Sequence, residues 1–275
     1  RRSWEAAMTV RGVDRVVVAT DDERIKSHAE GFGAEVVMTS SSAQNGTERC
    51  AEVVQQLTGY DVVVNLQGDA PLTPVWFVED LIAAMAAQPE AAVATPVVKC
   101  DAQTYAHFRA DRAASLVGGT TAVFDRNHRA LYFSKEVLPY IAPAKEAEAA
   151  GEVFHHVGLY AYRPAALAQY ATWSEGRLER HEGLEQLRFL ENGTDVLCVE
   201  VEGRGAVIEV TSSGQGNVSI GPADGDDVAL FGFGNNPLYY QEHAGELKFD
   251  LYIDSAATDL DGALRVKMES GFPAL

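Results

Sequence analysis

Short runs of β-branched residues alternate with amphipathic, helix-spaced stretches along the first part of the chain. Continuous apolar runs predict buried strands, whereas apolar residues spaced three or four apart predict helices. The predicted strands are Val13–Thr20, Ala34–Met38, Asp61–Gln67 and Ala91–Val98, and the predicted helices are Asp22–Phe32, Thr47–Leu57 and Trp76–Gln88. This alternation is typical of the α/β class and predicts a mainly parallel sheet with helices on both faces.

The pattern changes twice further along the chain. The middle part predicts strands at Ala122–Phe124, Ala130–Phe133 and His156–Tyr162, a helix at Leu178–Asn192 and a strand at Val196–Glu202. Past Arg204 the alternation of strands and helices ends, and the chain has three basic against eleven acidic side chains from Ala206 onward. Strict alternation at Leu247–Asp254 and at Leu264–Glu269 predicts half-buried strands there, as in an antiparallel sandwich. We therefore expect two domains, residues 1–205 and an acidic β-rich segment at 206–275 that forms a partial β-sandwich.

Composition narrows the possible partners. The 275 residues include 22 basic and 40 acidic side chains, for a net charge of −18. Such a surface repels duplex nucleic acid, so we expect no nucleic-acid partner, although a few Arg and Lys can still hold a small anion. Three scattered cysteines outside any C-x-x-C pattern indicate reduced thiols of an intracellular protein. No apolar run approaches the ~20 residues of a membrane-spanning helix, so no membrane partner is expected.

Polar loops follow the predicted strands, at the sheet edge where α/β proteins bind ligands. These loops are Thr20–Asp22, Ser40–Arg49 and Gln67–Pro71. In the last of them Gly68 precedes Asp69, a carboxylate suited to a Mg²⁺ ion that bridges nucleotide phosphates. A simple turn through Gly-Asp explains the same residues equally well.

The loop Ser40–Arg49 carries hydroxyls, amides and a glycine just before a predicted helix. Backbone N–H groups at a helix start suit an anion or the edge of a base. An alternative is that Thr47 is only the N-cap of this helix and that Gly46 only makes the turn. The length and polarity of the loop favour a ligand.

Two further groups of polar residues are candidates. His156 and Tyr160 have the same parity on one predicted strand, so they face the same side and can share a polar ligand, although a lone histidine is more often structural. Glu185, Gln186 and Arg188 lie on one predicted helix, where a solvated face explains them about as well.

Six segments, taken in order, resemble one known family. They are ATDDERI, SSAQNGTER, VVNLQGDAPL, ALYFSKEVLPY, HHVGLYAYR and LEQLRFLENG. From about Val13 to Glu202 the chain resembles the 3-deoxy-manno-octulosonate cytidylyltransferases, or CMP-KDO synthetases. The resemblance implies a nucleotidyltransferase-type, Rossmann-like α/β fold in a cytoplasmic homodimer. It also implies transfer of CMP from CTP to 3-deoxy-manno-octulosonate (KDO) with Mg²⁺ and release of pyrophosphate, for lipopolysaccharide synthesis.

The resemblance also implies roles for individual residues. It places the cytidine end of CTP at the loop and at the strand end that precedes Asp69, and the sugar acid at three later segments. Asp69 becomes the Mg²⁺ ligand, and Asp69 and Lys135 become the catalytic residues. The nucleotide-binding residues are Gln44, Gly46, Thr47, Arg49 and Gln67, and the sugar-binding residues are Ser134, His156, Tyr160, Glu185 and Gln186.

The chain departs from the family pattern in three places. Nothing before Val13 supplies the first strand and its Arg/Lys-containing phosphate loop, Ala70 stands where the family has Glu, and no second metal carboxylate follows Gly203. These departures predict an N-terminally truncated domain with impaired activity. The tail is similar to the C-terminal β-sandwich of secreted exo-glucanases. The alternatives are therefore a non-catalytic or carbohydrate-binding fusion protein, and a cytidylyltransferase for another acidic sugar such as a sialic acid.

Overall fold

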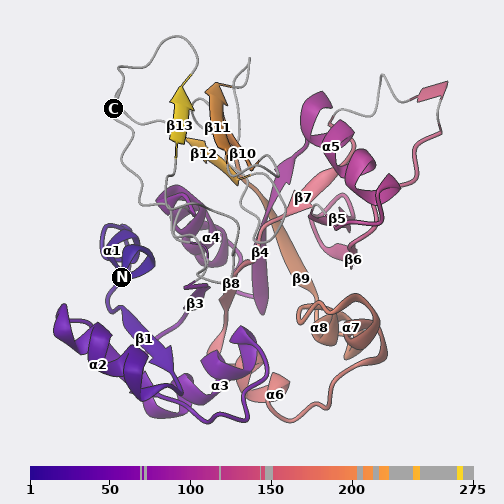
Figure 1. Ribbon diagram of the computed structural model, residues 1–275. Helices are drawn as coiled ribbons and strands as arrows, with labels where there is room; N and C mark the ends of the chain where they lie inside the picture. The colour runs from indigo at the N-terminus through magenta and orange to yellow at the C-terminus, as the bar shows by residue number, and fades with distance from the viewer. Residues whose placement is uncertain are drawn as a thin grey trace. The chain divides into compact units, whose positions relative to one another are not determined.

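The chain forms two compact units, Arg1–Val201 and Glu202–Leu275, in a computed structural model (Figure 1). The structure describes residues 1–68, 70, 73–117, 119–142, 144–145 and 151–202, together with the strands at 207–212, 217–222, 238–241 and 265–268. The division falls close to residue 205, where the sequence predicts a boundary. The predicted domains, 1–205 and 206–275, stay a prediction about independent folding.

A small parallel sheet opens the first unit. It consists of β1 (Val17–Thr20) and β2 (Glu35–Met38), joined by α2 (Glu23–Gly31). Helix α2 begins at the predicted place because the Asp22 side chain accepts a hydrogen bond from the Arg24 N–H and so caps the first turn. It ends before Gly33, which takes a φ of +88° that few other residues adopt. Helix α1 (Arg2–Ala7) packs on this region through Trp4, whose ring centroid lies 5.2 Å from that of Phe32.

A larger, mixed sheet forms the body of the first unit, and the described residues give it the order β3-β8-β4-β7-β5-β6. Strands β8 and β7 pair with different parts of β4, and β9 pairs with β4 as well. The first four strands in chain order are β3 (Val63–Leu66), β4 (Val93–Lys99), β5 (Thr120–Phe124) and β6 (Ala130–Ser134). The last three are β7 (Phe154–His156), β8 (Leu159–Tyr162) and β9 (Val196–Glu200).

The α/β class is confirmed, but the expected mainly parallel pairing is wrong for this sheet. Only β4 and β9 pair in parallel among its described strands, and the other pairs of these strands are antiparallel. Strand β8 lies between β3 and β4 and runs against both. The βα alternation correctly predicts that β3 and β4 run in the same direction. It does not reveal that a later strand inserts between them.

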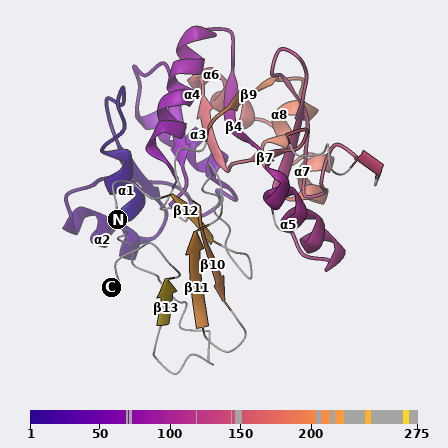
Figure 2. The same cartoon turned by 90° about the horizontal axis from the view of Figure 1, so that it is seen from above.

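Helices cover the two sheets. Helix α3 (Gly46–Gln56) packs on β1, on β3 and on α6 (Pro164–Tyr170), whereas α4 (Val75–Ala87) packs on β4, β8 and β9. Helix α5 (Ala102–Ala113) lies by β7 in both views (Figures 1 and 2) and contributes Tyr105 and Phe108 to a small apolar cluster with Val153. None of the helices in the described part of the chain has the length and apolar character that a membrane crossing requires.

Two predicted elements are each broken in two. The predicted strand His156–Tyr162 is interrupted after His156, so that β7 and β8 are separate strands. The predicted helix Leu178–Asn192 divides into α7 (Arg177–Glu182) and α8 (Leu187–Glu191). Gly183 causes the second break, because its φ of +63° is the left-handed conformation that ends a helix.

The main apolar core lies between the larger sheet and helices α6 and α8. Three fully buried aromatic rings form its centre: Tyr162 of β8 stacks on Phe189 of α8, which in turn lies 4.8 Å from Tyr170 of α6, centroid to centroid. This packing fixes α8, and therefore the residues just before it, against the sheet.

The second unit contains a four-stranded sheet in its described residues. The strands β10 (Val207–Ser212), β11 (Asn217–Pro222), β12 (Leu238–Gln241) and β13 (Arg265–Met268) take the order β12-β10-β11-β13. Strand β10 is antiparallel to both of its neighbours, but β11 and β13 are parallel, unlike the antiparallel sandwich that we expected. The strand predicted at 247–254 lies outside the described residues.

The packing of α4 on the larger sheet generates a stability prediction. Leu81 of α4 is 0% exposed, so Leu81→Ala leaves a cavity and should lower the free energy of unfolding by about 2–5 kcal/mol. Ile25 of α2 is 50% exposed, so Ile25→Ala should change it by less than about 0.5 kcal/mol. Urea denaturation of both variants checks this, and equal losses would contradict the assignment of α4 to the core.

Candidate active site

The polar loop before α3 is held by its own side chains. Asn45 is the N-cap, and its Oδ1 accepts the N–H of Glu48 at 2.8 Å. The Glu48 carboxylate turns back along the chain, where its Oε2 accepts the N–H of Gln44, also at 2.8 Å. The alternative that Thr47 caps this helix is therefore wrong, and Gln44 is exposed beside a fixed backbone.

Thr47 supports this loop from within the protein. The residue is 0% exposed, its hydroxyl lies 2.7 Å from the hydroxyl of Tyr162, and its N–H donates to Glu185 Oε2 at 2.9 Å. Thr47 thus connects the loop to β8 and to the segment before α8, and its place among the nucleotide-binding residues stays a prediction. The neighbouring Gly46 lies so close to Asn65 of β3 that a Cβ there would be 2.6 Å from the Asn65 Nδ2.

Arg49 joins the ends of the two strands of the small sheet. Its guanidinium lies 3.1 Å from the Asp21 carboxylate, which follows β1, and donates to the Thr39 hydroxyl, which follows β2. The loop at Thr20–Asp22 and the loop at Ser40–Arg49 therefore meet, as expected of the carboxyl ends of neighbouring parallel strands.

The third predicted loop is only partly described. Gln67 follows β3, and its Oε1 would lie 3.7 Å from a Cβ at Gly158, so Gln67 lies beside the bend between β7 and β8. Asp69 lies outside the described residues, so its role as a metal ligand stays a prediction. Among the residues that the structure does describe, no group of three or more His, Cys, Asp and Glu side chains is arranged to hold a metal.

His156, Tyr160 and Gln186 form one buried hydrogen-bonded chain. The Tyr160 hydroxyl donates to Gln186 Oε1 at 3.0 Å, and Gln186 Nε2 lies 3.5 Å from His156 Nδ1. His156 Nε2 in turn lies 2.9 Å from the hydroxyl of Thr95, which also donates to the Leu159 carbonyl oxygen at 2.8 Å. Since Thr95 has a single proton to donate, the consistent assignment is a His156 protonated on Nε2 that accepts from Gln186 at Nδ1.

Burial keeps this chain neutral. Loss of solvent, and then the neighbouring His155, lower the pKa of His156 to about 3, and burial lowers the pKa of His155 to about 4. Burial also raises the pKa of Tyr160 well above its usual value. The cluster consequently presents neutral hydrogen-bonding groups at neutral pH, which suit hydroxyl groups better than a carboxylate or a phosphate.

Ser134 and Lys135 are positioned by Glu182, a residue that the sequence analysis did not single out. The Glu182 carboxylate accepts from the Ser134 hydroxyl at 2.7 Å and from the Lys135 N–H at 2.9 Å. The Lys135 ammonium lies at the end of α7, where it would be 2.9 Å from a Cβ on Gly183. The end of β6 and the end of α7 are thus joined through one carboxylate.

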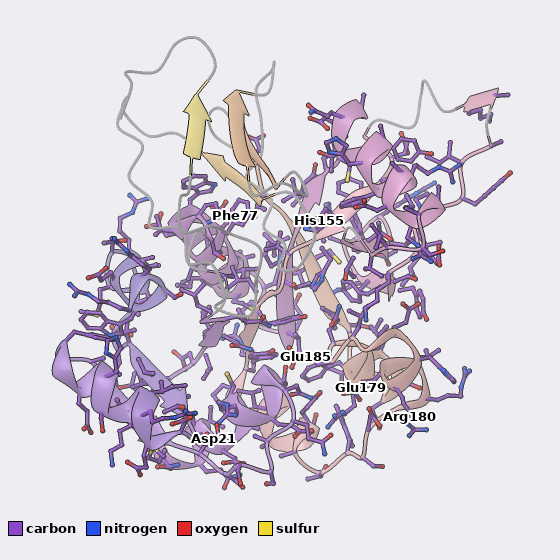
Figure 3. The ribbon with its side chains drawn as sticks, in the orientation of Figure 1. Asp21, Phe77, His155, Glu179, Arg180 and Glu185 are labelled. Atoms are coloured by element: carbon purple, nitrogen blue, oxygen red, sulfur yellow. The ribbon has the colours of Figure 1, made fainter. Side chains whose placement is uncertain are left out.

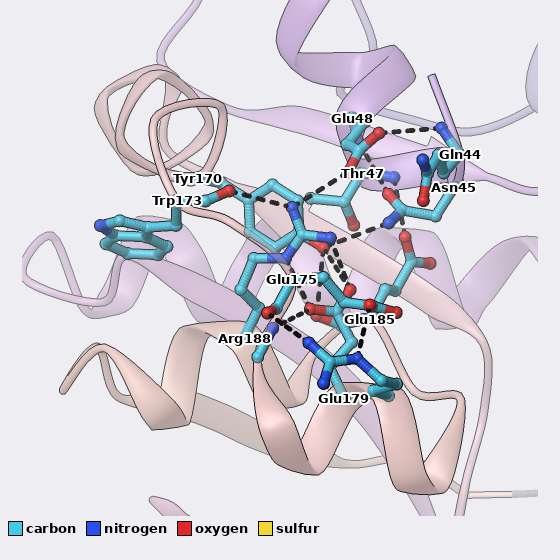
Figure 4. A network of polar contacts seen from close by, with 12 residues as sticks. Gln44, Asn45, Thr47, Glu48, Tyr170, Trp173, Glu175, Glu179, Glu185 and Arg188 are labelled. Carbon is cyan, nitrogen blue, oxygen red and sulfur yellow. Dashed lines mark hydrogen bonds and ion pairs between the residues drawn. The ribbon is translucent and has the colours of Figure 1, made fainter. Parts of the chain in front are cut away.

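The alternative of a solvated face is wrong for Gln186 and Arg188, although Arg180 and His181 of the same predicted helix are exposed. Gln186 is 1% and Arg188 is 3% exposed, and the guanidinium of Arg188 donates to both oxygens of Glu179 at 2.6 Å (Figure 4). Glu179 and Glu185 lie near one another in Figure 3, and the Tyr170 hydroxyl contacts both residues. Burial raises the pKa of the Glu185 carboxyl, which the hydrogen bonds from Thr47 partly oppose. Neither Glu179 nor Arg188 carries a local sequence signal of this burial.

Comparison with known proteins gives a consistent result. The sequence pattern of the cytidylyltransferases matches residues 1–196. A 3-deoxy-manno-octulosonate cytidylyltransferase of Maricaulis maris is 41% identical over 205 residues, which cover 74% of this chain and 78% of that protein. The enzyme of the same name from Francisella tularensis subsp. novicida is 40% identical over 185 residues, covering 66% and 70%. A solved CMP-2-keto-3-deoxy-manno-octonic acid synthetase in complex with CTP is similar with a TM-score of 0.63 and 34% identity, covering 73% of this chain and 77% of that one.

The buried histidines generate a prediction on the pH dependence of stability. The unfolded chain binds a proton at each histidine near pH 6.5, whereas folded His156 and His155 stay neutral down to about pH 3 and 4. The contribution of these histidines to the free energy of unfolding should therefore be fully present above pH 7. The free energy of unfolding should fall by about 2 kcal/mol per buried histidine between pH 7 and pH 5.

The variant His156→Gln removes one of these two contributions. Its stability loss between pH 8 and pH 5 should be about 2 kcal/mol smaller than that of the unsubstituted chain. Urea denaturation at both pH values measures this, and the value at pH 8 separates lost packing from the pH effect. An unchanged loss in the variant would contradict a buried neutral His156.

Proposed function

Since the chain belongs to the 3-deoxy-manno-octulosonate cytidylyltransferase family, we propose that it transfers CMP from CTP to KDO and releases pyrophosphate. The product would be CMP-KDO, an activated sugar for lipopolysaccharide synthesis. Under this proposal the protein acts in the cytoplasm as a homodimer and uses Mg²⁺. The relatives named above carry the name of this activity, as cytidylyltransferases or CMP synthetases of this sugar acid.

The observation that carries the proposal is the contact between the two halves of the candidate site. The loop at 44–49 and the segment at 185–186 are far apart in the sequence, yet the Thr47 N–H donates to the Glu185 carboxylate at 2.9 Å. Gln186, the next residue, holds His156 and Tyr160. A nucleotide on the loop and a sugar on the His156–Gln186–Tyr160 chain would therefore be neighbours.

Each half offers chemistry that suits its proposed substrate. Neutral donors and acceptors at His156, Tyr160 and Gln186 suit the hydroxyl groups of a sugar acid. The amide side chains of Gln44 and Gln67 and the backbone beside Gly46 suit the edge of a cytosine, which presents both donors and acceptors. These polar groups would reject a base whose pattern leaves them unpaired.

The proposed reaction is a direct transfer between the two substrates, so it depends mainly on their alignment. The anomeric hydroxyl of the sugar attacks the α-phosphorus of CTP in line with the departing pyrophosphate, so positioning and charge stabilisation supply most of the rate. Asp69 would hold Mg²⁺, which neutralises phosphate charge when bound. Lys135, held at its backbone by Glu182, would supply a further positive charge beside the sugar acid.

Release of pyrophosphate tests the proposal directly. The protein should release pyrophosphate when CTP, KDO and Mg²⁺ are all present, and should release much less when any one is omitted. Replacing KDO by N-acetylneuraminic acid should lower kcat/KM, and a preference for that sugar would reassign the substrate. No pyrophosphate with either sugar would overturn the proposal in favour of a non-catalytic role.

The sugar side of the site generates a prediction about Tyr160. Tyr160→Phe removes the hydrogen bond to Gln186 and frees that side chain, so the KM for KDO should rise by roughly three- to ten-fold, the value of one hydrogen bond. The KM for CTP should stay within about two-fold. Tyr140→Phe is the matched control, because Tyr140 is 80% exposed and should behave as the unsubstituted protein. Equal changes in both KM values for Tyr160→Phe would argue against a role on the sugar side.

A further inference from the structure

A single buried guanidinium links the loop at 44–49 to helix α7. Arg188 uses Nε and NH2 to hold both oxygens of Glu179, and NH1 to donate to Glu48 Oε1 at 3.0 Å (Figure 4). Its guanidinium carbon also lies 4.2 Å from the centroid of the Tyr170 ring, and its side chain is only 4% exposed. The planar fork of arginine permits this triple engagement, which an ammonium group cannot reproduce.

The contact with Glu48 continues into the backbone of the loop. One Glu48 oxygen accepts from Arg188, and the other accepts the Gln44 N–H at 2.8 Å. The line of contacts therefore runs from Glu179 through Arg188 and Glu48 to the main chain at Gln44. Both partners of Glu48 are donors, so only a carboxylate satisfies the two at once.

Arg188 also lies close in the sequence to Gln186, one of the proposed sugar-binding residues. Arg188 stands two residues after Gln186, and the neighbouring Phe189 packs in the main core. A shift of the guanidinium would thus disturb Glu48 on the loop while the apolar core keeps the backbone of α8 in place. Arg188 is only 3% exposed and its guanidinium is engaged by Glu179 and Glu48, so its role is to position other residues.

We propose that Arg188 is a positioning residue that fixes the nucleotide-binding loop through Glu48. This inference rests on the proposed function, because it takes the loop at 44–49 as the binding site of the cytidine end of CTP. When Arg188 contacts Glu48, the loop is ordered before CTP binds, so the free-energy cost of ordering it on binding is smaller. With the link broken, CTP binding weakens whereas the chemistry between bound substrates changes little.

Two substitutions break the link from opposite ends. Arg188→Lys keeps the positive charge but cannot hold Glu179 with two bonds and Glu48 with a third. Glu48→Gln keeps the shape and leaves the Arg188–Glu179 pair intact, so it remains informative if Arg188→Lys lowers stability. The matched controls are Arg180→Lys and Glu175→Gln, which alter an exposed Arg–Glu pair whose atoms lie 3.0 Å apart on the outer side of α7.

Calorimetry of CTP binding and steady-state kinetics provide the first readout. Both variants of the link should raise the Kd and the KM for CTP about ten-fold, while kcat and the KM for KDO change by less than about three-fold. The two control variants should bind CTP as the unsubstituted protein does. Equal losses for CTP and KDO, or a full loss of kcat with unchanged CTP binding, would overturn the positioning role.

Amide hydrogen exchange of the full chain provides a second readout that needs no substrate. The amides of residues 40–49 should exchange about ten-fold faster in Arg188→Lys and Glu48→Gln than in either control, with the amides of α4 unchanged. Unchanged exchange at 40–49 would overturn this inference even if the enzyme is active. If the exchange result holds but the unsubstituted protein neither binds nor consumes CTP, the proposed function fails instead.

Discussion

One buried cation, Arg188, pairs with two carboxylates at the candidate site. Glu48 and Glu179 flank Arg188, and Glu185 lies close by against Tyr170 and Thr47. Removing one partner of such a pair leaves an uncompensated buried charge, which costs about 3–5 kcal/mol in known cases. This guanidinium therefore links the loop before α3 to α7, while the apolar core holds the backbone of α8.

The sheet supplies the frame on which this cluster is built. Helix α3 packs on β1, β3 and α6, and α8 packs on β6, so the two segments that meet at Thr47 and Glu185 are brought from distant parts of the chain. The small and apolar residues of the core fix the backbones, whereas the hydrogen bonds select the orientation of the side chains. Site geometry of this kind is precise because its supporting residues are themselves locked by packing.

Much of the fold follows from local patterns in the sequence. The β-branched runs correctly predict β1 to β4, and Asp22 and Gly33 correctly mark the two ends of α2, because strand burial and helix termination are local effects. The sequence also contains Gly183, the residue that divides α7 from α8, although apolar spacing alone extends one helix across it. The insertion of β8 between β3 and β4 is not local, and no pattern within either segment encodes it.

The candidate site is less accessible to such reasoning. Motif resemblance points to His156, Tyr160 and Gln186, and the structure brings these three into contact. It does not point to Glu179 or Glu182, and it leaves open whether Arg188 is solvated, because a charged residue in a helix looks the same in sequence whether it is solvated or buried. Glu48 and Arg188 are separated by 140 residues, so their pairing emerges only in the fold. The contact of the Thr47 hydroxyl with Tyr162 likewise joins residues that are far apart in the sequence, so it too emerges only in the fold.

The contacts of Arg188 with Glu179 and Glu48 order the loop at 44–49 before CTP binds. A double-mutant cycle tests this role most directly. The Kd for CTP would be measured by calorimetry for the unsubstituted chain, Glu48→Gln, Arg188→Lys and the double variant. If the two residues act through one contact, the double variant should bind CTP no more weakly than the weaker single variant, which gives a coupling free energy of about 1 kcal/mol or more. Additive losses would show that Glu48 and Arg188 act independently, and would contradict the account.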